Sequence, residues 1–148
     1  MTDIETVDLE LVADVTVECV ARTDPEAASP DPELSERAVG FVVDKPPAFG
    51  GTDRGPMPSE YFAAAIASCN MMTARRIAAK RKVGYEQIKC RALVHLEGSD
   101  IDKVVLAFEV VSDAAVDDWE TVFRLADRTC TVSRATKCAI ERTVRVRS

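Results

Sequence analysis

Apolar and polar residues alternate in five stretches of the chain, and alternation with a period of two predicts β-strands that have one buried face. In the first stretch the alternation is interrupted near Ala13 and Asp14, so this stretch is either one strand or two. The third and fourth stretches are separated by Gly98, Ser99 and Asp100, a turn that predicts an antiparallel hairpin. The five stretches are residues 7–21, 37–44, 87–97, 102–111 and 138–147.

A long helix is predicted between the second and third strands, from Ser59 to Val83. Pro58 suits its first position, where the missing N–H is no loss, and Gly84 suits the residue just past its end. Residues 61–66 have no polar face, and a helix that is apolar all round is buried. The helix becomes basic in its second half, so only its first half demands complete burial.

A second, amphipathic helix is predicted after the fourth strand. Asp117 followed by Glu120 resembles a capping box at its start. One more turn beyond its apolar stripe reaches Cys130. The stripe consists of Trp119, Val122, Phe123 and Ala126 at helical spacing.

The order of these elements predicts an α+β fold in which antiparallel sheets pack on helices, in a single domain covering residues 1–148. Residues 23–32 read as a connection within that domain. One small sheet covers only one side of the long helix. A second subunit would cover the rest, so we predict a homodimer with two-fold symmetry.

Composition narrows the functional class. The chain of 148 residues is 47% hydrophobic and 30% charged, which is typical of a soluble globular domain. Its net charge of −6 argues against a nucleic-acid partner, because such proteins show a basic footprint. No apolar run approaches the roughly 18 residues needed to span a membrane. Residues 1–10 are acidic and do not resemble a secretory signal, so we predict the cytoplasm.

Five scattered cysteines do not predict a disulfide framework. His95 is the only histidine and no C-x-x-C motif occurs, so neither a metal nor a cofactor is predicted. His95 shares a strand face with Lys89 and Arg91 and is interpreted as solvated. The glycine-rich run from Gly50 to Pro58 lacks the lysine and the spacing of a phosphate-binding loop. A shaped connection into the long helix is therefore the better interpretation of that run.

Cys69 and Cys130 are the best candidates for a reactive pair. A peroxide-reducing centre needs a thiolate that attacks the O–O bond and a second thiol that captures the sulfenic acid. Cys69 lies mid-helix, so its activation needs a nearby cation or hydrogen-bond donors; Arg76 could supply the cation or could simply be solvated. Cys130 follows a helix end in a polar context. Cys19 and Cys90 fall among inward-facing strand positions and are interpreted as packing, while Cys138 has no assigned role.

The run GGTDRGPMPSEYFAAAIASCNMMT, together with CTVSRA far downstream, resembles the OsmC/Ohr family, named for osmotically inducible protein C and organic hydroperoxide resistance protein. The resemblance covers nearly the whole chain. It implies an intertwined homodimer in which antiparallel sheets wrap around long central helices, with active sites at the subunit interface. It also implies a thiol peroxidase that reduces organic hydroperoxides without metal, haem or flavin.

The resemblance further implies the roles of single residues. Cys69 matches the peroxidatic position and Cys130 the resolving position, so that a Cys69–Cys130 disulfide forms and a cellular dithiol reduces it. Family peroxidases carry a glutamate where this chain has Ser59. The next residue, Glu60, which is expected in the first turn of the long helix, is the candidate catalytic carboxylate. They also use an arginine from the N-terminal strands, for which Arg22 and Arg37 are both candidates. In these respects the chain is more similar to the broader OsmC-like branch.

The predicted substrate is an alkyl hydroperoxide, because apolar residues surround Cys69 in the predicted arrangement. They are Phe62, Ile66, Met72 and Phe123. Two rival interpretations stay open: a non-catalytic protein of the same fold that binds a small apolar ligand, and a redox sensor that passes its disulfide to a partner.

Overall fold

The computed structural model describes residues 5–13, 15–23 and 38–148. The chain divides into two compact units, Met1–Pro58 and Ser59–Ser148. Arg37 and residues 24–36, which include most of the predicted connection, lie outside the described residues.

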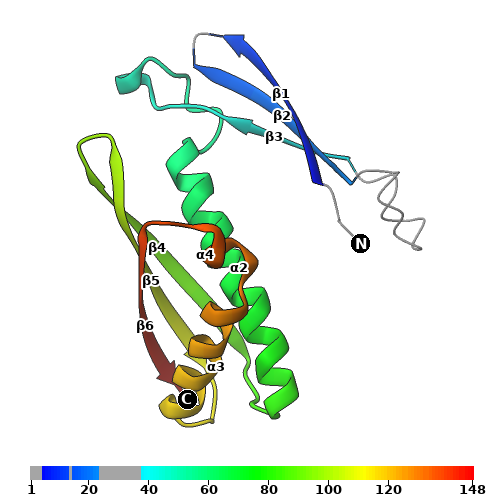
Figure 1. Ribbon diagram of the computed structural model, residues 1–148, viewed down its shortest axis with the longest axis vertical. Helices are drawn as coiled ribbons and strands as arrows, with labels where there is room; N and C mark the ends of the chain where they lie inside the picture. The colour runs from blue at the N-terminus through cyan, green and yellow to red at the C-terminus, as the bar shows by residue number, and fades with distance from the viewer. Residues whose placement is uncertain (1–4, 14, 24–37) are drawn as a thin grey trace. The chain divides into compact units, whose positions relative to one another are not determined.

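The Met1–Pro58 unit contains a three-stranded antiparallel sheet in the order β1-β2-β3 (Figure 1). The first predicted stretch forms two strands, and the pairing of Ala13 with Thr16 places the break where the alternation is interrupted. A short 3-10 helix, η1, follows the sheet. The elements are β1 (Glu5–Ala13), β2 (Thr16–Thr23), β3 (Ala38–Val43) and η1 (Pro47–Phe49).

The Ser59–Ser148 unit is built on the predicted long helix, α2, which spans Pro58–Arg81. Pro58 is its first residue, as predicted. The helix ends earlier than Gly84 indicates, because Lys82 adopts the left-handed conformation (φ 58°) and the N–H of Val83 closes the last turn on the carbonyl of Ala78 at 2.9 Å. No helix in the described part of the chain combines the length and the apolar composition that a membrane span requires.

The second sheet has the order β4-β5-β6. The predicted hairpin between β4 and β5 is confirmed, and Gly98 occupies its turn with φ 62°. The expectation of antiparallel pairing throughout is wrong for β6, which pairs parallel with β5. Two helices between β5 and β6 form a crossover that returns the chain to the same end of the sheet, as parallel strands require. The strands are β4 (Gln87–Glu97), β5 (Asp100–Val111) and β6 (Ala139–Arg147).

The crossover consists of α3 (Val116–Thr129) and α4 (Thr131–Ala135). The predicted capping box is wrong, because α3 begins at Val116 and Asp117 is already inside its first turn. Its N-cap is Ala115, whose side chain makes no capping bond. The carboxylate of Asp117 instead complements the positive end of the helix dipole.

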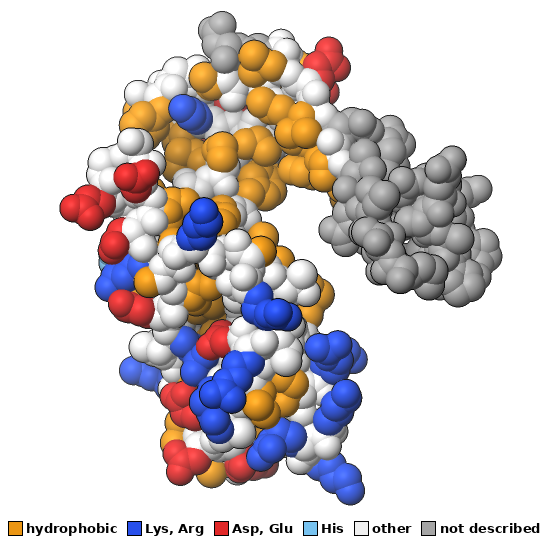
Figure 2. Space-filling view, in the orientation of Figure 1, with side chains coloured by type: hydrophobic (Ala, Val, Ile, Leu, Met, Phe, Trp, Pro, Cys, Tyr) orange, Lys and Arg blue, Asp and Glu red, His pale blue; other side chains and the backbone are white. Residues whose placement is uncertain are grey.

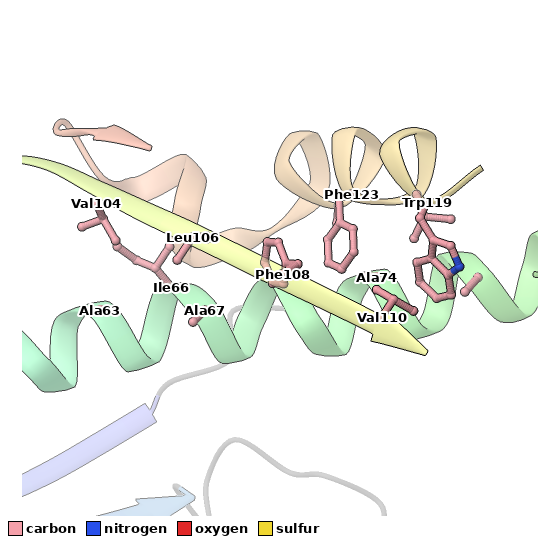
Figure 3. Packing of buried hydrophobic residues seen from close by; sticks show 13 residues of the cluster. Ala63, Ile66, Ala67, Ala74, Val104, Leu106, Phe108, Val110, Trp119 and Phe123 are labelled. Carbon is pink, nitrogen blue, oxygen red and sulfur yellow. The ribbon is translucent and has the colours of Figure 1, made fainter. Parts of the chain in front are cut away.

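The core of this unit lies between α2, α3 and the central strand β5 (Figure 3). Phe108 on β5 stacks on Phe123 of α3, with ring centroids 4.0 Å apart. The predicted apolar stripe of α3 is confirmed, since its four residues are fully buried. The stacking of Phe108 on Phe123 fixes α3 against β5, and it thereby positions Cys130 at the end of α3.

Candidate dithiol site

Two cysteines far apart in the sequence meet within the Ser59–Ser148 unit. Cys69 lies in the middle of α2 and is half-buried. Cys130 is fully buried and joins α3 to α4, as the C-cap of one helix and the N-cap of the other. Their Sγ atoms lie 2.6 Å apart, and both cysteines are free thiols. A movement of about half an ångström would bring the sulfurs to the 2.05 Å of a disulfide.

Asn70 organises the surroundings of Cys130 from the neighbouring position on α2. Its fully buried amide Nδ2 donates to the carbonyl of Ile66 at 3.1 Å and to Ser133 Oγ at 2.7 Å. The same nitrogen lies 3.8 Å from Cys130 Sγ. The backbone N–H of Ser133 donates to that sulfur at 3.5 Å. Cys130 therefore faces three groups that can donate to a thiolate: Asn70, Ser133 and Cys69.

The two thiols differ in acidity. Burial raises the pKa of Cys69, and the hydrogen bond with Cys130 raises it further. Backbone N–H groups of α4 act to lower this pKa, but their effect is smaller. Burial also acts to raise the pKa of Cys130, but hydrogen bonds from Cys69 and Ser133 outweigh it, so its pKa falls below the ordinary value. By contrast, burial without such donors raises the pKa of Cys90 to about 11.

A cavity of about 950 Å³ opens beside the pair. Cys69 lines it, together with residues from the second half of α2 and from the loop after it. Among the four predicted pocket residues, Met72 lines this cavity and is 67% exposed. Ile66 and Phe123 instead lie in the hydrophobic core, and Phe62 packs against that core. Within this unit, only one of the four predicted pocket residues therefore lines the cavity beside Cys69.

The remaining candidate residues are placed as follows. Glu60 lies exposed in the first turn of α2, as predicted. Arg22 belongs to β2, where it pairs with Thr6 and Ala38. Arg37 lies outside the described residues, so the choice between these two arginines stays open. Arg76 lines the cavity with Cys69.

The other three cysteines are not part of the pair. Cys19 is buried on β2, and Cys90 is half-buried on β4 against the core. Cys138, which had no assigned role, also packs against the core. His95 is exposed on β4, as predicted. No cluster of three or more His, Cys, Asp or Glu side chains suited to a metal ion occurs among residues 5–13, 15–23 and 38–148.

The glycine-rich run in the Met1–Pro58 unit wraps around a buried carboxylate, that of Asp44. This carboxylate accepts hydrogen bonds from Thr52 Oγ1 at 2.6 Å and from the N–H groups of Lys45 at 2.7 Å and Arg54 at 3.1 Å. The Thr52 hydroxyl is the largest of several donors that hold the pKa of Asp44 well below its usual range. Donors that could have bound a phosphate are already used, which favours the interpretation as a shaped connection.

Close approach explains two glycines of this run. A Cβ at Gly51 would lie 1.8 Å from the carbonyl oxygen of Lys45, and one at Gly55 would lie 2.1 Å from that of Val42. Any side chain at either position would force the loop away from β3.

The fold and the adjacent thiols define a small α+β protein with a dithiol centre at the junction of two helices. The model of the family described as OsmC-like protein matches residues 51–145, so the chain belongs to this family. The matched region includes all but the first residue of the glycine-rich run, and both cysteines of the pair. No curated protein is similar enough to this sequence to count as a match.

Solved structures share this fold. An OsmC-like protein of unknown function from Vibrio cholerae is 16% identical, with a TM-score of 0.74 over 97% of this chain and 99% of that one. An organic hydroperoxide resistance protein from Elizabethkingia anophelis is 17% identical, with a TM-score of 0.67 over 99% and 96%. The organic hydroperoxide resistance protein OhrB of Bacillus subtilis is 17% identical, with a TM-score of 0.60 over 97% and 98%. At these identities the likeness establishes the fold alone.

Asn70 and Ser133 are functional candidates that the sequence analysis missed. A signal for Asn70 is present, because it is the only amide side chain of the long helix and lies in its mainly apolar half. Ser133 lies three residues after Cys130, the spacing at which a capping side chain meets a backbone N–H. Neither residue points to its partner without the fold.

Proposed function

We propose that this protein is a thiol peroxidase that reduces organic hydroperoxides through a Cys69–Cys130 disulfide. The observation that carries the proposal is the 2.6 Å separation of the two Sγ atoms, with Cys69 on the wall of a cavity. Cys69 is the attacking residue because a hydroperoxide in the cavity can reach it, whereas Cys130 is fully buried. The organic hydroperoxide resistance proteins among the structures of similar fold support this choice of substrate class.

The reaction balances with these two residues alone. The Cys69 thiolate attacks the terminal oxygen of the hydroperoxide, the O–O bond breaks, and Cys69 becomes a sulfenic acid. The departing alkoxide takes the proton held by Cys130 and leaves as the alcohol. Cys130 then attacks Cys69 Sγ, the S–O bond breaks, and water leaves as the disulfide forms. Because the sulfurs are 2.6 Å apart, the proton of Cys69 can pass to the Cys130 thiolate, so one ionisation serves both residues.

The proposal extends to assembly and location. Exposed apolar side chains include Leu9, Leu11 and Met72, each about two-thirds exposed (66%, 65% and 67%). A second copy of the chain would cover such residues, so the working unit is a homodimer. Reduction of the disulfide requires a thiol-rich compartment, which fits the cytoplasm.

The test is mass spectrometry after one equivalent of cumene hydroperoxide. We expect a Cys69–Cys130 linkage in the wild-type protein and loss of peroxide consumption in Cys69→Ser. Cys130→Ser should complete one turnover and then accumulate sulfenic and sulfinic acid at Cys69. Cys90→Ser is the matched control and should consume peroxide normally. Slow oxidation spread over all five cysteines would rule the peroxidase out.

The raised pKa of Cys69 favours a second candidate, a non-catalytic member of the family that binds a small ligand in the cavity. The two candidates differ in the measured acidity of the pair. A first thiol ionisation near or above the free value of about 8.5 would favour the ligand-binding protein, and one well below it would favour the peroxidase.

A further inference from the structure

The sheet β4-β5-β6 has an outer face, opposite the face that packs on α2 and α3. On the packed face, Val104, Leu106 and Phe108 of β5 are buried in the core. Side chains alternate along each strand, so the residues between these core positions point to the outer face. A second cavity of about 560 Å³ opens there, and we call it the outer-sheet cavity. Six outer-face side chains line it: Lys89 and Arg91 of β4, Ala107 and Glu109 of β5, and Thr143 and Arg145 of β6.

Two small side chains form the floor of the outer-sheet cavity. Ala107 on the central strand pairs with Thr143 on β6 and, on its other side, with Arg91 on β4. Neighbouring strands lie about 4.8 Å apart, so residues on β4 and β6 are separated by about 10 Å across β5. Long side chains on the two outer strands and a short one on the central strand therefore leave a hollow between them.

The sides of the cavity carry more positive than negative charge. Glu109 is the one carboxylate among the residues that line it, and this carboxylate forms an ion pair with Arg147. Lys89 and Arg145 flank Glu109 in the strand register. In the described part of the chain, Lys89, Arg91 and Arg145 form no ion pair. Three cations thus line the hollow without a partner carboxylate.

This positive charge does not follow from the overall composition, because the whole chain has a net charge of −6. The Ser59–Ser148 unit contains 15 Lys and Arg residues against 12 Asp and Glu residues, so the negative excess belongs to the Met1–Pro58 unit. Figure 2 shows Lys and Arg side chains over much of the Ser59–Ser148 unit. This unit therefore attracts anions although the chain as a whole is negative.

A second copy of the chain that covers Met72 leaves the outer face open. Met72 is exposed on α2, and α2 packs on the core face of the sheet. That copy would approach α2 from the side away from the sheet, so α2 and the sheet would lie between the copy and the outer-sheet cavity. The cavity thus stays accessible in the homodimer proposed above.

We propose that the outer-sheet cavity binds a small soluble molecule that carries two or more phosphate groups. Its volume lies within the range of roughly 300–1,000 Å³ typical of small-molecule sites. Three unpaired cations match the several negative charges of such a ligand, and the guanidinium groups of Arg91 and Arg145 can each bind a phosphate through two parallel hydrogen bonds. The next register position, Leu93 beside Val105, is apolar and offers a surface for the organic part of the ligand. The site uses neither cysteine of the dithiol pair, so it does not rest on the peroxidase proposal.

Isothermal titration calorimetry of the full chain with inorganic pyrophosphate tests the site. Pyrophosphate supplies two phosphate groups alone, ADP adds an organic part, and adenosine is the control ligand without phosphate. We expect pyrophosphate and ADP to bind with a Kd below about 1 mM at low salt. Adenosine should not bind measurably.

Variants separate a shaped site from general attraction by charge. Lys89→Gln with Arg145→Gln should raise the Kd for pyrophosphate at least about tenfold, because charge-assisted hydrogen bonds are lost. Ala107→Leu fills the floor without changing any charge and should weaken binding by a similar factor. The matched control, Arg124→Gln with Arg128→Gln, removes two exposed cations from α3 and should keep the Kd within about twofold. Circular dichroism checks that each variant keeps the fold.

Three results would overturn the proposal: no binding of pyrophosphate, equal weakening in the α3 control, or an unchanged Kd when the floor is filled. Thr143→Leu fills the same floor and replaces Ala107→Leu if that variant does not fold. Binding to vesicles that contain phosphatidic acid, by a protein that does not bind pyrophosphate, would also overturn it in favour of a lipid surface. None of these measurements involves peroxide, so their failure leaves the peroxidase proposal standing.

Discussion

The side chains of Asp44 and Cys130 can each carry a negative charge, and the two units stabilise that charge with different sets of hydrogen-bond donors. Most donors to Asp44 come from its own loop, at most ten residues away in the sequence, and the hydroxyl of Thr16 on β2 adds one more. The donors to Cys130 come from Asn70, 60 residues away, and from Ser133 at distances of 3.5–3.8 Å. Asp44 is saturated with short hydrogen bonds, whereas Cys130 has long ones and touches a thiol at a cavity wall. Because its hydrogen-bond acceptors are all used, the carboxylate of Asp44 has a structural role. The sulfur of Cys130 has weaker hydrogen bonds and lies near a cavity, so it stays reactive.

The largest expected effect is on the loop around Asp44. Gly51→Ala would place a Cβ 1.8 Å from the carbonyl oxygen of Lys45 and 2.8 Å from Asp44 Oδ1. We expect the free energy of unfolding to fall by about 3 kcal/mol, because the neighbouring atoms are backbone and cannot move aside cheaply. Urea unfolding followed by circular dichroism measures this loss. Gly40→Ala on β3 is the control, since its Cβ would meet no atom closer than 3.9 Å. Equal stability of the two variants would show that the loop is not held closed.

A smaller effect is expected from the charge of Asp44. Its pKa is lower in the folded protein than in the unfolded chain, where it is about 3.9. The carboxylate therefore stabilises the fold above about pH 4, and this contribution is lost as the pH falls from there towards the folded pKa. Asp44→Asn should lower stability at neutral pH and flatten its decline in acid. Asp53→Asn, in the same loop but exposed, should retain that decline. If the stability of Asp44→Asn declines in acid as steeply as that of the wild type, the carboxylate does not stabilise the loop.

Sequence patterns predicted the parts of the fold that depend on neighbours along the chain. Alternation located the strands, and the stripe from Trp119 to Ala126 gave the buried face of α3, because both are local periodicities. The parallel pairing of β6 was missed, since it depends on where α3 and α4 return the chain. The capping box failed because Ala115, which has no capping group, is the residue before the helix.

The candidate site was predictable only in its cysteines. The contexts of Cys69 and Cys130 selected them as a reactive pair, the family resemblance implied a disulfide between them, and their sulfurs lie 2.6 Å apart. The acidity of the pair could not be predicted, because it depends on Asn70 and Ser133, which approach Cys130 only in three dimensions. The buried positions of Ile66 and Phe123 were missed for the same reason: these side chains are equally apolar whether they face a substrate or the core.

The smallest expected effect concerns Asn70 as a positioning residue. Asn70→Ala removes the amide that donates to Ser133 Oγ and lies beside Cys130 Sγ. Because this amide favours the thiolate, its loss should raise the pKa of Cys130. A hydrogen bond of about 1 kcal/mol corresponds to a roughly three- to fivefold slower formation of the disulfide at neutral pH. Stopped-flow measurement across pH should show the rate profile displaced to higher pH.

Ser133→Ala provides the matched comparison for Asn70. It removes the hydroxyl that accepts from Asn70 and that also lowers the pKa of Cys130, but keeps the backbone N–H that donates to Cys130 Sγ, so the displacement should have the same sign. A purely structural role for Asn70 would lower stability without moving the pH profile. In that case the hydrogen bonds around Cys130 would serve only the stability of the fold, as those around Asp44 do, and the contrast between the two units would disappear.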